Sequence, residues 1–344
     1  MRHGRKILVG LSALAMAIGF AVTAQAKDKK TVGILYCPVA KKHYEEFRAD
    51  YKKKYGDDVE FKVYEAHTPE QLNEYASKLA KEAPDVIVTT CERTTRPVVE
   101  RIKGTDQKLV FMSNAPSHLV GEWQKSVKNS TGVSSVMEDQ IDYNLTQARA
   151  LHPKAKKIAV LTSMDAELFI SENHGTHDDH HRKLMGQFFA YMNKSHKAMM
   201  KKHGFSGDII NVTNDKELKQ AQAKLKKGKY DLVYVSITGT YQVKFDALLE
   251  AVKTAKILSL TNKPEIVKAG AVAGFYAKDT HLIDQATVMA KDALDGKAAK
   301  APLLATEYEI HVNLTTAQAI GFDGPDDLVN KATMVHGKMK VSKK

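Results

Sequence analysis

The sequence predicts an α/β protein with two lobes, each a doubly wound parallel sheet covered by helices on both faces. Three observations predict this fold class. Buried runs of strand length alternate with helical segments along most of the chain. The alternation comes in two sets of similar length, and 344 residues amount to about two domains. Buried strands separated by helices are typical of parallel sheets with both faces covered.

The first set of elements is predicted from apolar runs and helix signals. Residues 31–37 (TVGILYC) are a continuous apolar run of strand length, and 59–64 (VEFKVY) alternate as a strand does. Thr68 followed by Pro69 is typical of a helix N-terminus. We therefore expect strands over 31–37, 59–64, 85–90, 108–112 and 132–136, and helices over 42–55, 69–82, 95–103 and 138–151.

The second set repeats the alternation. Apolar runs such as 157–162 (KIAVLT) and 231–236 (DLVYVS) have the length of buried strands. Glycines follow two of the helical segments, at Gly296 and Gly321, and mark where those helices end. We expect strands over 157–162, 208–212, 231–236, 256–260, 271–276 and 307–312, and helices over much of 163–203 and over 215–227, 241–254, 280–294 and 315–320.

The first 26 residues have the three parts of a secretory signal peptide. A basic start (RHGRK) precedes an apolar stretch over 7–22, and a small-x-small cleavage site ends at Ala26. The apolar stretch is short for a membrane span, which needs about 20 residues. We therefore expect an exported, periplasmic protein cleaved after Ala26.

Composition excludes several classes of protein. Two cysteines are too few for a multi-disulfide scaffold or a four-cysteine zinc ribbon. The excess of 52 basic over 40 acidic residues is spread over many predicted helices, and no nucleic-acid motif accompanies it, which indicates a solvated basic surface. There is no G-x-S-x-G elbow, phosphate-binding glycine loop or H-E-x-x-H motif, so we expect neither an enzyme nor a cofactor.

Three stretches of sequence carry a resemblance to a known family. Residues 115–121 (APSHLVG) with 129–134 (NSTGVS) resemble that family's "DPV-x-x-x-LV … N-x-TGVS" passage. Residues 265–273 (EIVKAGAVA) resemble "SSVKAGALA", and 309–321 (EIHVNLTTAQAIG) resemble "xLVINLKTAKALG". The family is that of the solute-binding proteins of ABC transporters, in the branch that includes tryptophan- and tyrosine-binding proteins.

The resemblance implies the type I periplasmic-binding-protein fold, whose two lobes are joined by a hinge of three crossings near residues 134, 270 and 305. Lobe one would be 27–134 plus 270–305, and lobe two 135–269 plus 306–344. The resemblance also implies an ABC permease and its ATPase as partners, with membrane contact only through the permease. The segment after Thr162 is longer than in the family and rich in histidine.

Ligands of doubly wound sheets bind beyond the carboxyl ends of the strands. Ser, Thr and Asn are frequent there, and hydroxyls beside free helix N–H groups can cradle an anion, although the same hydroxyls can simply cap the helices. Acidic side chains at strand ends would hold an ammonium group, and Tyr241 or Tyr276 would supply an aromatic wall for an apolar ligand side chain. The expected ligand residues are Pro38, Glu92, Arg93, Thr94, Ser113, Asn114, Ser163, Asp165, Thr238, Thr240, Thr261, Asn262, Glu265 and Tyr276.

Two further features have alternative interpretations. Cys37 and Cys91 end strands that are neighbours in the order 2-1-3-4-5, so they form either a disulfide or a pair of free thiols beside the cleft. In the segment 174–181, His174, His177 and His181 would share one helix face, where imidazoles can bind a metal ion; the segment is otherwise a solvated loop or a lid over the cleft.

These features favour one function over two alternatives. The favoured function is that of a monomeric, exported solute-binding protein, which captures a small ligand between its lobes and delivers it to an ABC importer. The resemblance points to an amino acid as the ligand, and nucleic acid is not expected. The alternatives are a ligand-sensing module for a membrane receptor kinase and a metal-binding protein that uses the histidine segment.

Overall fold

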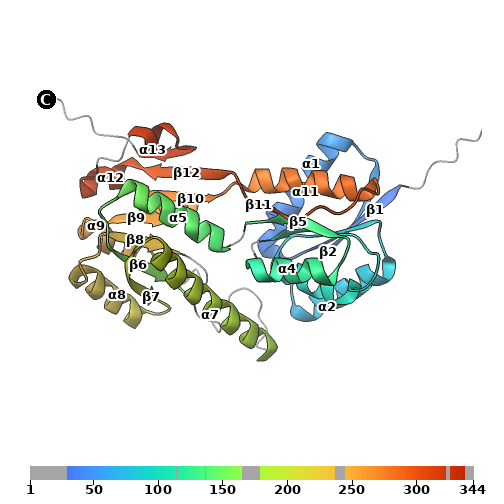
Figure 1. Ribbon diagram of the computed structural model, residues 1–344, viewed down its shortest axis with the longest axis horizontal. Coiled ribbons are helices and arrows are strands. Elements are labelled where there is room, and N and C mark those ends of the chain that lie inside the picture. The colour runs from blue at the N-terminus through green and yellow to red at the C-terminus, as the bar shows by residue number, and fades with distance from the viewer. Residues whose placement is uncertain are drawn as a thin grey trace, which may run out of the picture.

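Two mainly parallel sheets form the centres of two lobes that lie side by side (Figure 1). The structure is a computed structural model, and it describes residues 29–113, 115–135, 137–164, 179–236, 245–322 and 326–337. Helices cover both faces of each sheet, as expected for strands that have apolar side chains on both faces. The predicted fold class is therefore confirmed. Among the described residues, no helix has the length and apolar character needed to cross a membrane.

The sheet of the first lobe has the order β11-β5-β4-β3-β1-β2, and all its pairings are parallel. The predicted order 2-1-3-4-5 is therefore confirmed. Its strands are β1 (Lys30–Tyr36), β2 (Val59–Glu65), β3 (Val86–Thr89), β4 (Leu109–Ser113), β5 (Ser130–Ser134) and β11 (Leu303–Leu304). Its helices are η1 (Pro38–Ala40), α1 (Lys41–Tyr55), α2 (Pro69–Glu82), α3 (Glu92–Ile102), α4 (Ser117–Ser126) and α11 (Asp279–Leu294).

The sheet of the second lobe has the order β13-β12-β10-β9-β8-β6-β7, in which only β10 and β12 pair antiparallel. Its strands are β6 (Lys157–Thr162), β7 (Ser206–Asn211), β8 (Leu232–Val235), β9 (Leu258–Thr261), β10 (Ala273–Ala277), β12 (Tyr308–Asn313) and β13 (Met334–His336). Its helices are α5 (Met137–Leu151), α7 (Asp179–Lys202), α8 (Asp215–Lys227), α9 (Phe245–Thr254), α10 (Pro264–Ala269), α12 (Leu314–Ile320) and α13 (Asp326–Asn330).

Each sheet is buried on both faces because successive side chains of a strand point in opposite directions. In β1, Val32 and Ile34 join a cluster with α1 and α11, whereas Leu35 joins another with α2 and α3. The second sheet has two equivalent clusters. The expected cap of α2 also forms, since the Thr68 hydroxyl accepts a hydrogen bond from the Gln71 N–H.

The chain passes between the two sheets after β5, after β10 and after β11. The first and third passages lie near the expected residues 134 and 305. The second lies later than residue 270, because Ala273–Ala277 pairs with β9 and β12 in the second sheet. We therefore propose that the C-terminal part of lobe one begins at about α11 and not at residue 270.

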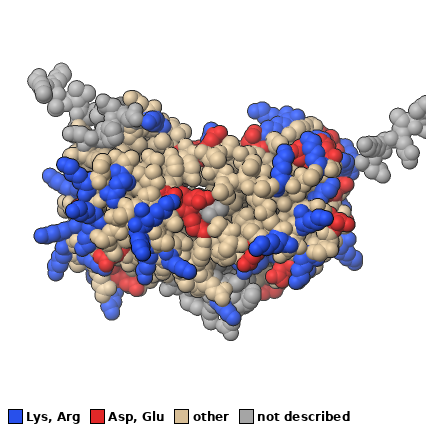
Figure 2. All heavy atoms as spheres, viewed as in Figure 1, with Lys and Arg blue, Asp and Glu red and all other residues tan. Residues whose placement is uncertain are grey.

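Lysine and arginine side chains are spread over the outer surfaces of both lobes (Figure 2). They do not gather into one large patch on the face shown, and acidic side chains lie among them, including a small group near the middle. This distribution agrees with the expectation of a solvated basic surface.

Candidate functional site

The carboxyl ends of the two sheets face each other across the hinge. Strand β5 leads directly into α5 of the second lobe, and β10, which is parallel to β9, leads directly into α11 of the first. Contacts also join the lobes there. The Ser117 hydroxyl donates a hydrogen bond to Glu138 over 3.0 Å, and the rings of His118 and Tyr191 lie 4.9 Å apart. The outline of the molecule is notched between the lobes (Figure 2).

Some of the expected ligand residues are used within lobe one. The Glu92 carboxylate accepts a hydrogen bond from the Arg96 guanidinium over 2.7 Å, one turn along α3. The buried Thr94 hydroxyl donates to the Cys91 carbonyl and accepts from the N–H groups of Thr90 and Cys91. Thr94 therefore caps α3, and Glu92 already has a cationic partner.

Arg93 differs from its neighbours because no carboxylate of the described part of the chain forms an ion pair with it, and the charges that act on it are those of Cys37, Cys91 and Glu92. It lies in the first turn of α3, and no hydrogen bond or ion pair joins its guanidinium to a described residue. Burial lowers the pKa of Arg93, and the nearby sulfurs of Cys37 and Cys91 partly offset this decrease. A desolvated cation without a partner is costly, so this position favours an anionic group of a ligand.

Unpaired polar atoms gather at the same strand ends. The hydroxyls of Thr90, Ser113 and Ser134 and the Asn262 side-chain oxygen are buried, and within the described residues none has a hydrogen-bond partner. They follow or end β3, β4, β5 and β9. Buried polar groups are nearly always hydrogen-bonded in folded proteins, so a shared unpaired set indicates where a polar ligand binds.

The sequence interpretation missed two members of this set, Thr90 and Ser134. Thr90 ends the apolar run 85–90 (DVIVTT), so a signal for it was available in the sequence, whereas Ser134 lies in a strand that is itself rich in polar residues (STGVS). The sequence places both residues inside predicted strands, 85–90 and 132–136, whereas ligands of doubly wound sheets are expected beyond the strand ends. The Ser113 and Asn262 proposals agree with the unpaired atoms found there.

In lobe two, several expected ligand residues have protein partners. The Thr261 hydroxyl donates to the Val235 carbonyl over 2.9 Å, which links β9 to β8. The Tyr276 hydroxyl is hydrogen-bonded to His311, and burial, followed by nearby Glu309, raises the pKa of Tyr276 well above its usual range. Glu265 is exposed in the first turn of α10. The half-buried Tyr276 ring is thus held in place from within its own lobe.

The remaining proposed residues are only partly described. Ser163 is buried after β6, and Pro38 is exposed in η1. The signal peptide over 1–26 and the residues Asn114, Asp165, Thr238, Thr240, His174 and His177 lie outside the described residues, as does the side chain of His181. Within the part that is described, no group of three or more His, Cys, Asp or Glu side chains is placed to hold a metal ion.

The two cysteines meet at the same edge of lobe one. Cys37 follows β1, Cys91 precedes α3, and their sulfur atoms lie 3.1 Å apart as free thiols. The expected proximity is therefore confirmed. The separation exceeds the roughly 2.05 Å of a disulfide bond, so the structure shows the pair in its thiol form.

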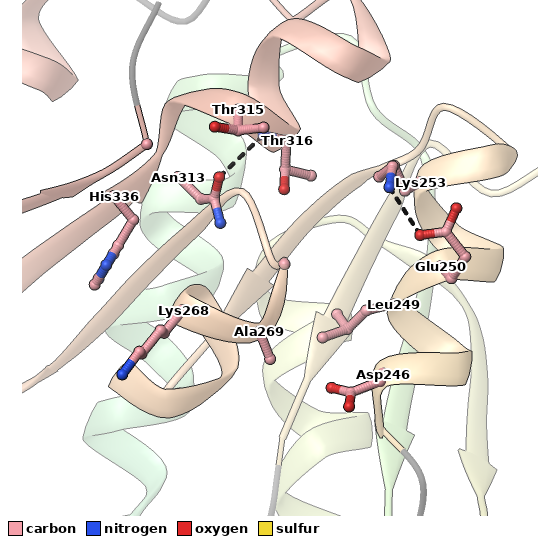
Figure 3. Close-up of a pocket in the computed structure, with 12 residues that line it drawn as sticks. Asp246, Leu249, Glu250, Lys253, Lys268, Ala269, Asn313, Thr315, Thr316 and His336 are labelled. Atoms are coloured by element: carbon pink, nitrogen blue, oxygen red, sulfur yellow. Dashed lines mark hydrogen bonds and ion pairs between the residues drawn. The ribbon is translucent and has the colours of Figure 1, made fainter.

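A separate cavity of about 440 Å³ lies in lobe two between α9, α10 and α12 (Figure 3). Some of its polar groups are paired: the Asn313 side chain accepts from the Thr316 N–H and donates to the Val267 carbonyl, and Lys253 pairs with Glu250. The cavity adjoins the start of β10 and the end of β12, away from the strand ends that face lobe one. The unpaired groups therefore favour the inter-lobe edge as the ligand site.

Comparison with known proteins agrees with this architecture. Residues 190–336 match the family model described as ABC transporter substrate binding protein. No curated protein sequence matches the chain. The resemblance seen in the sequence is thus confirmed: residues 190–336 are similar to the substrate-binding proteins of ABC transporters, and the chain has the type I periplasmic-binding-protein fold.

Three solved structures illustrate the shared fold. The ligand-free, open structure of CD0873 from Clostridium difficile, a substrate binding protein with adhesive properties, has a TM-score of 0.68 at 20% identity and covers 90% of this chain and 100% of its own. A Vibrio cholerae conserved domain protein has a TM-score of 0.62 at 19% identity, covering 89% and 99%. The Streptococcus pneumonia ABC domain in complex with L-Trp has a TM-score of 0.62 at 17% identity, also covering 89% and 99%.

Proposed function

We propose that this chain captures a small carboxylate-bearing ligand, with amino acids as the leading class, between its two lobes and delivers it to an ABC importer. The observation that carries the proposal is the set of unpaired buried hydroxyls of Thr90, Ser113 and Ser134 at the ends of β3, β4 and β5, in the same lobe as the Arg93 guanidinium in the first turn of α3. A carboxylate bound at this edge would pair with the guanidinium and accept hydrogen bonds from hydroxyls of this set.

The ligand class has support on chemical grounds and from one relative. Guanidinium groups bind carboxylates through two parallel hydrogen bonds, which fixes the orientation of the ligand as well as its charge. The Streptococcus pneumonia relative has L-Trp bound, an amino acid with one carboxylate. In this chain Glu265 and Asp165 remain the proposed partners of an ammonium group, since Glu92 is already paired with Arg96.

The same proposal covers location and partners. The chain would be exported through its signal peptide, cleaved after Ala26, and would act as a monomer that docks on a permease with its ATPase. N-terminal sequencing of the exported protein tests the cleavage site. Size-exclusion chromatography of the same material tests the monomer.

The ligand is best found by a thermal-shift screen of the purified chain against amino acids and other small carboxylates. A ligand that binds the native state alone raises the melting temperature. Calorimetry then compares Arg93→Gln with Arg101→Gln, which lies on the same helix but is exposed at its last turn. We expect a loss of about 2–5 kcal/mol, at least tenfold in affinity, for Arg93→Gln and no change for Arg101→Gln.

Two results would refute the proposal. One is a screen in which only uncharged or cationic compounds raise the melting temperature. The other is an Arg93→Gln variant that folds normally and binds its carboxylate ligand as tightly as the wild type.

A further inference from the structure

Cys37 and Cys91 are far apart in the sequence and adjacent in the fold. Strands β1 and β3 pair in parallel, which places the residues that follow them at one edge of the sheet. The two sulfur atoms are 3.1 Å apart, and both are free thiols. A disulfide needs only a modest further approach of the two side chains, to about 2.05 Å.

The two sulfurs have different surroundings. Cys91 is partly exposed at the N-terminus of α3, where the backbone N–H of Thr94 donates to its sulfur and the Thr94 hydroxyl lies 3.6 Å away. Cys37 is fully buried, with 0% of its surface exposed. Arg93 interacts electrostatically with both sulfurs. Helix N-termini and nearby guanidinium groups stabilise a thiolate, so Cys91 carries the negative charge more readily than Cys37.

The pKa values of the two thiols are shifted in opposite directions from the usual value. The hydrogen bond from Cys37, followed by those from Thr94, lowers the pKa of the Cys91 thiol. The same contact with Cys91, together with burial, raises the pKa of Cys37. Geometry and charge thus assign the two cysteines different roles, one an accessible thiolate and the other a buried thiol.

We propose that Cys37 and Cys91 form a reversible dithiol–disulfide pair at the ligand-binding edge of lobe one, with Cys91 as the attacking sulfur. The oxidant is a small-molecule or protein disulfide. The Cys91 thiolate attacks one of its sulfurs, forms a mixed disulfide and releases a thiolate. Cys37 then loses its proton to solvent or to the released thiolate, attacks the Cys91 sulfur and expels the second thiolate. Two electrons pass from the protein to the oxidant.

This reaction changes the charge of the site. Before it, a thiolate lies beside Arg93; after it, the disulfide is neutral and Arg93 has lost that neighbour. The redox state of the pair therefore alters the electrostatic potential at the edge where a ligand would bind. The test below uses no ligand, so its failure leaves the proposed function untouched.

The experiment treats the reduced, full chain with oxidised glutathione and follows free thiols and intact mass. We expect the wild type to lose both thiols without retaining glutathione. Cys37→Ser lacks the second sulfur and should retain one glutathione on Cys91. Cys91→Ser, the matched control, should react at least about tenfold more slowly, because its remaining thiol is buried and protonated.

Either of two outcomes would overturn the proposal: a wild type that keeps both thiols, or a Cys91→Ser variant that reacts as fast as Cys37→Ser. If a serine variant does not fold, limiting iodoacetamide on the native wild type, followed by peptide mapping, gives the same information. Cys91 should be alkylated first, and alkylation of Cys37 first contradicts the assignment.

Discussion

A polar side chain near a strand end either bonds to groups of its own lobe or is available to bind a ligand. Its hydrogen-bond partners show which of the two roles it has. Thr94 and Thr261 have hydroxyls that bond to backbone groups of their own lobe. Ser113 has none among the described residues, and no carboxylate there forms an ion pair with Arg93. Since Ser, Thr and Arg side chains suit both roles, the sequence could identify the four residues as candidates but could not tell which role each has.

The effect of burial on the titration of a single side chain can be tested at His196. It lies in α7 with 0% of its surface exposed, and its ring nitrogen is 2.8 Å from the Ser236 hydroxyl at the end of β8. Burial lowers the pKa of His196 to about 4. Between about pH 6.5 and pH 4 the unfolded chain binds this proton and the folded chain does not, so stability falls as the pH falls.

Urea unfolding at several pH values from 7 to 4.5 measures this effect. At about 1.4 kcal/mol per pH unit, His196 accounts for a loss of up to about 3 kcal/mol across the window. His196→Gln cannot take up the proton, so its stability should depend less steeply on pH. His67→Gln, at an exposed position, should keep the wild-type slope. Equal slopes for His196→Gln and the wild type would contradict the assignment.

At the scale of elements, the length of a strand decided whether the sequence could predict it. The long apolar runs were placed correctly as β1, β3, β6 and β8. The short strands β11 and β13 were missed because two or three residues carry no period, and they form only by pairing with β5 and β12. The resemblance implied that residues 270–305 belong to lobe one, whereas β10 pairs with β9 and β12 of the second sheet, since a run of apolar residues does not say which sheet it will join.

Gly132 in β5 shows why one residue of the N-x-TGVS passage is glycine. A β-carbon there would lie 2.3 Å from the Phe111 carbonyl oxygen and 2.5 Å from its ring. We expect Gly132→Ala to destabilise the fold by about 1–3 kcal/mol through overpacking. Denaturant titration measures this free energy of unfolding.

Gly121 in α4 is the matched control, because a β-carbon there would meet nothing within 4 Å. Gly121→Ala should stabilise the protein by about 0.5–1 kcal/mol, since alanine favours a helix interior over glycine. If the two substitutions have equal effects, steric crowding is not what distinguishes the positions.

At the scale of the whole molecule, the His118–Tyr191 contact joins α4 of one lobe to α7 of the other, with ring centroids 4.9 Å apart. An aromatic contact of this kind is worth about 0.5–1.5 kcal/mol. Tyr191→Ala should therefore weaken binding of the ligand found by screening by about 2–10-fold, although Tyr191 is not at a strand end. Calorimetry measures the affinity.

Tyr75→Ala is the control for this prediction, because Tyr75 pairs with Tyr64 at 5.4 Å within lobe one. Its loss should lower stability and leave the affinity unchanged. Equal affinities for Tyr191→Ala and the wild type would show that the cross-lobe contact does not contribute to the bound arrangement.

The sequence by itself determined the fold class, the strand order of lobe one and a resemblance to the solute-binding proteins of ABC transporters, because these follow from local periodicity and from motifs along the chain. Only the tertiary structure decided which strand-end groups are free, that the Cys37 and Cys91 sulfurs are in contact, and which sheet contains β10. These features depend on partners distant in sequence, such as the 54 residues that separate the two cysteines. A local pattern fixes what a residue can do, and long-range packing decides which of those roles it has.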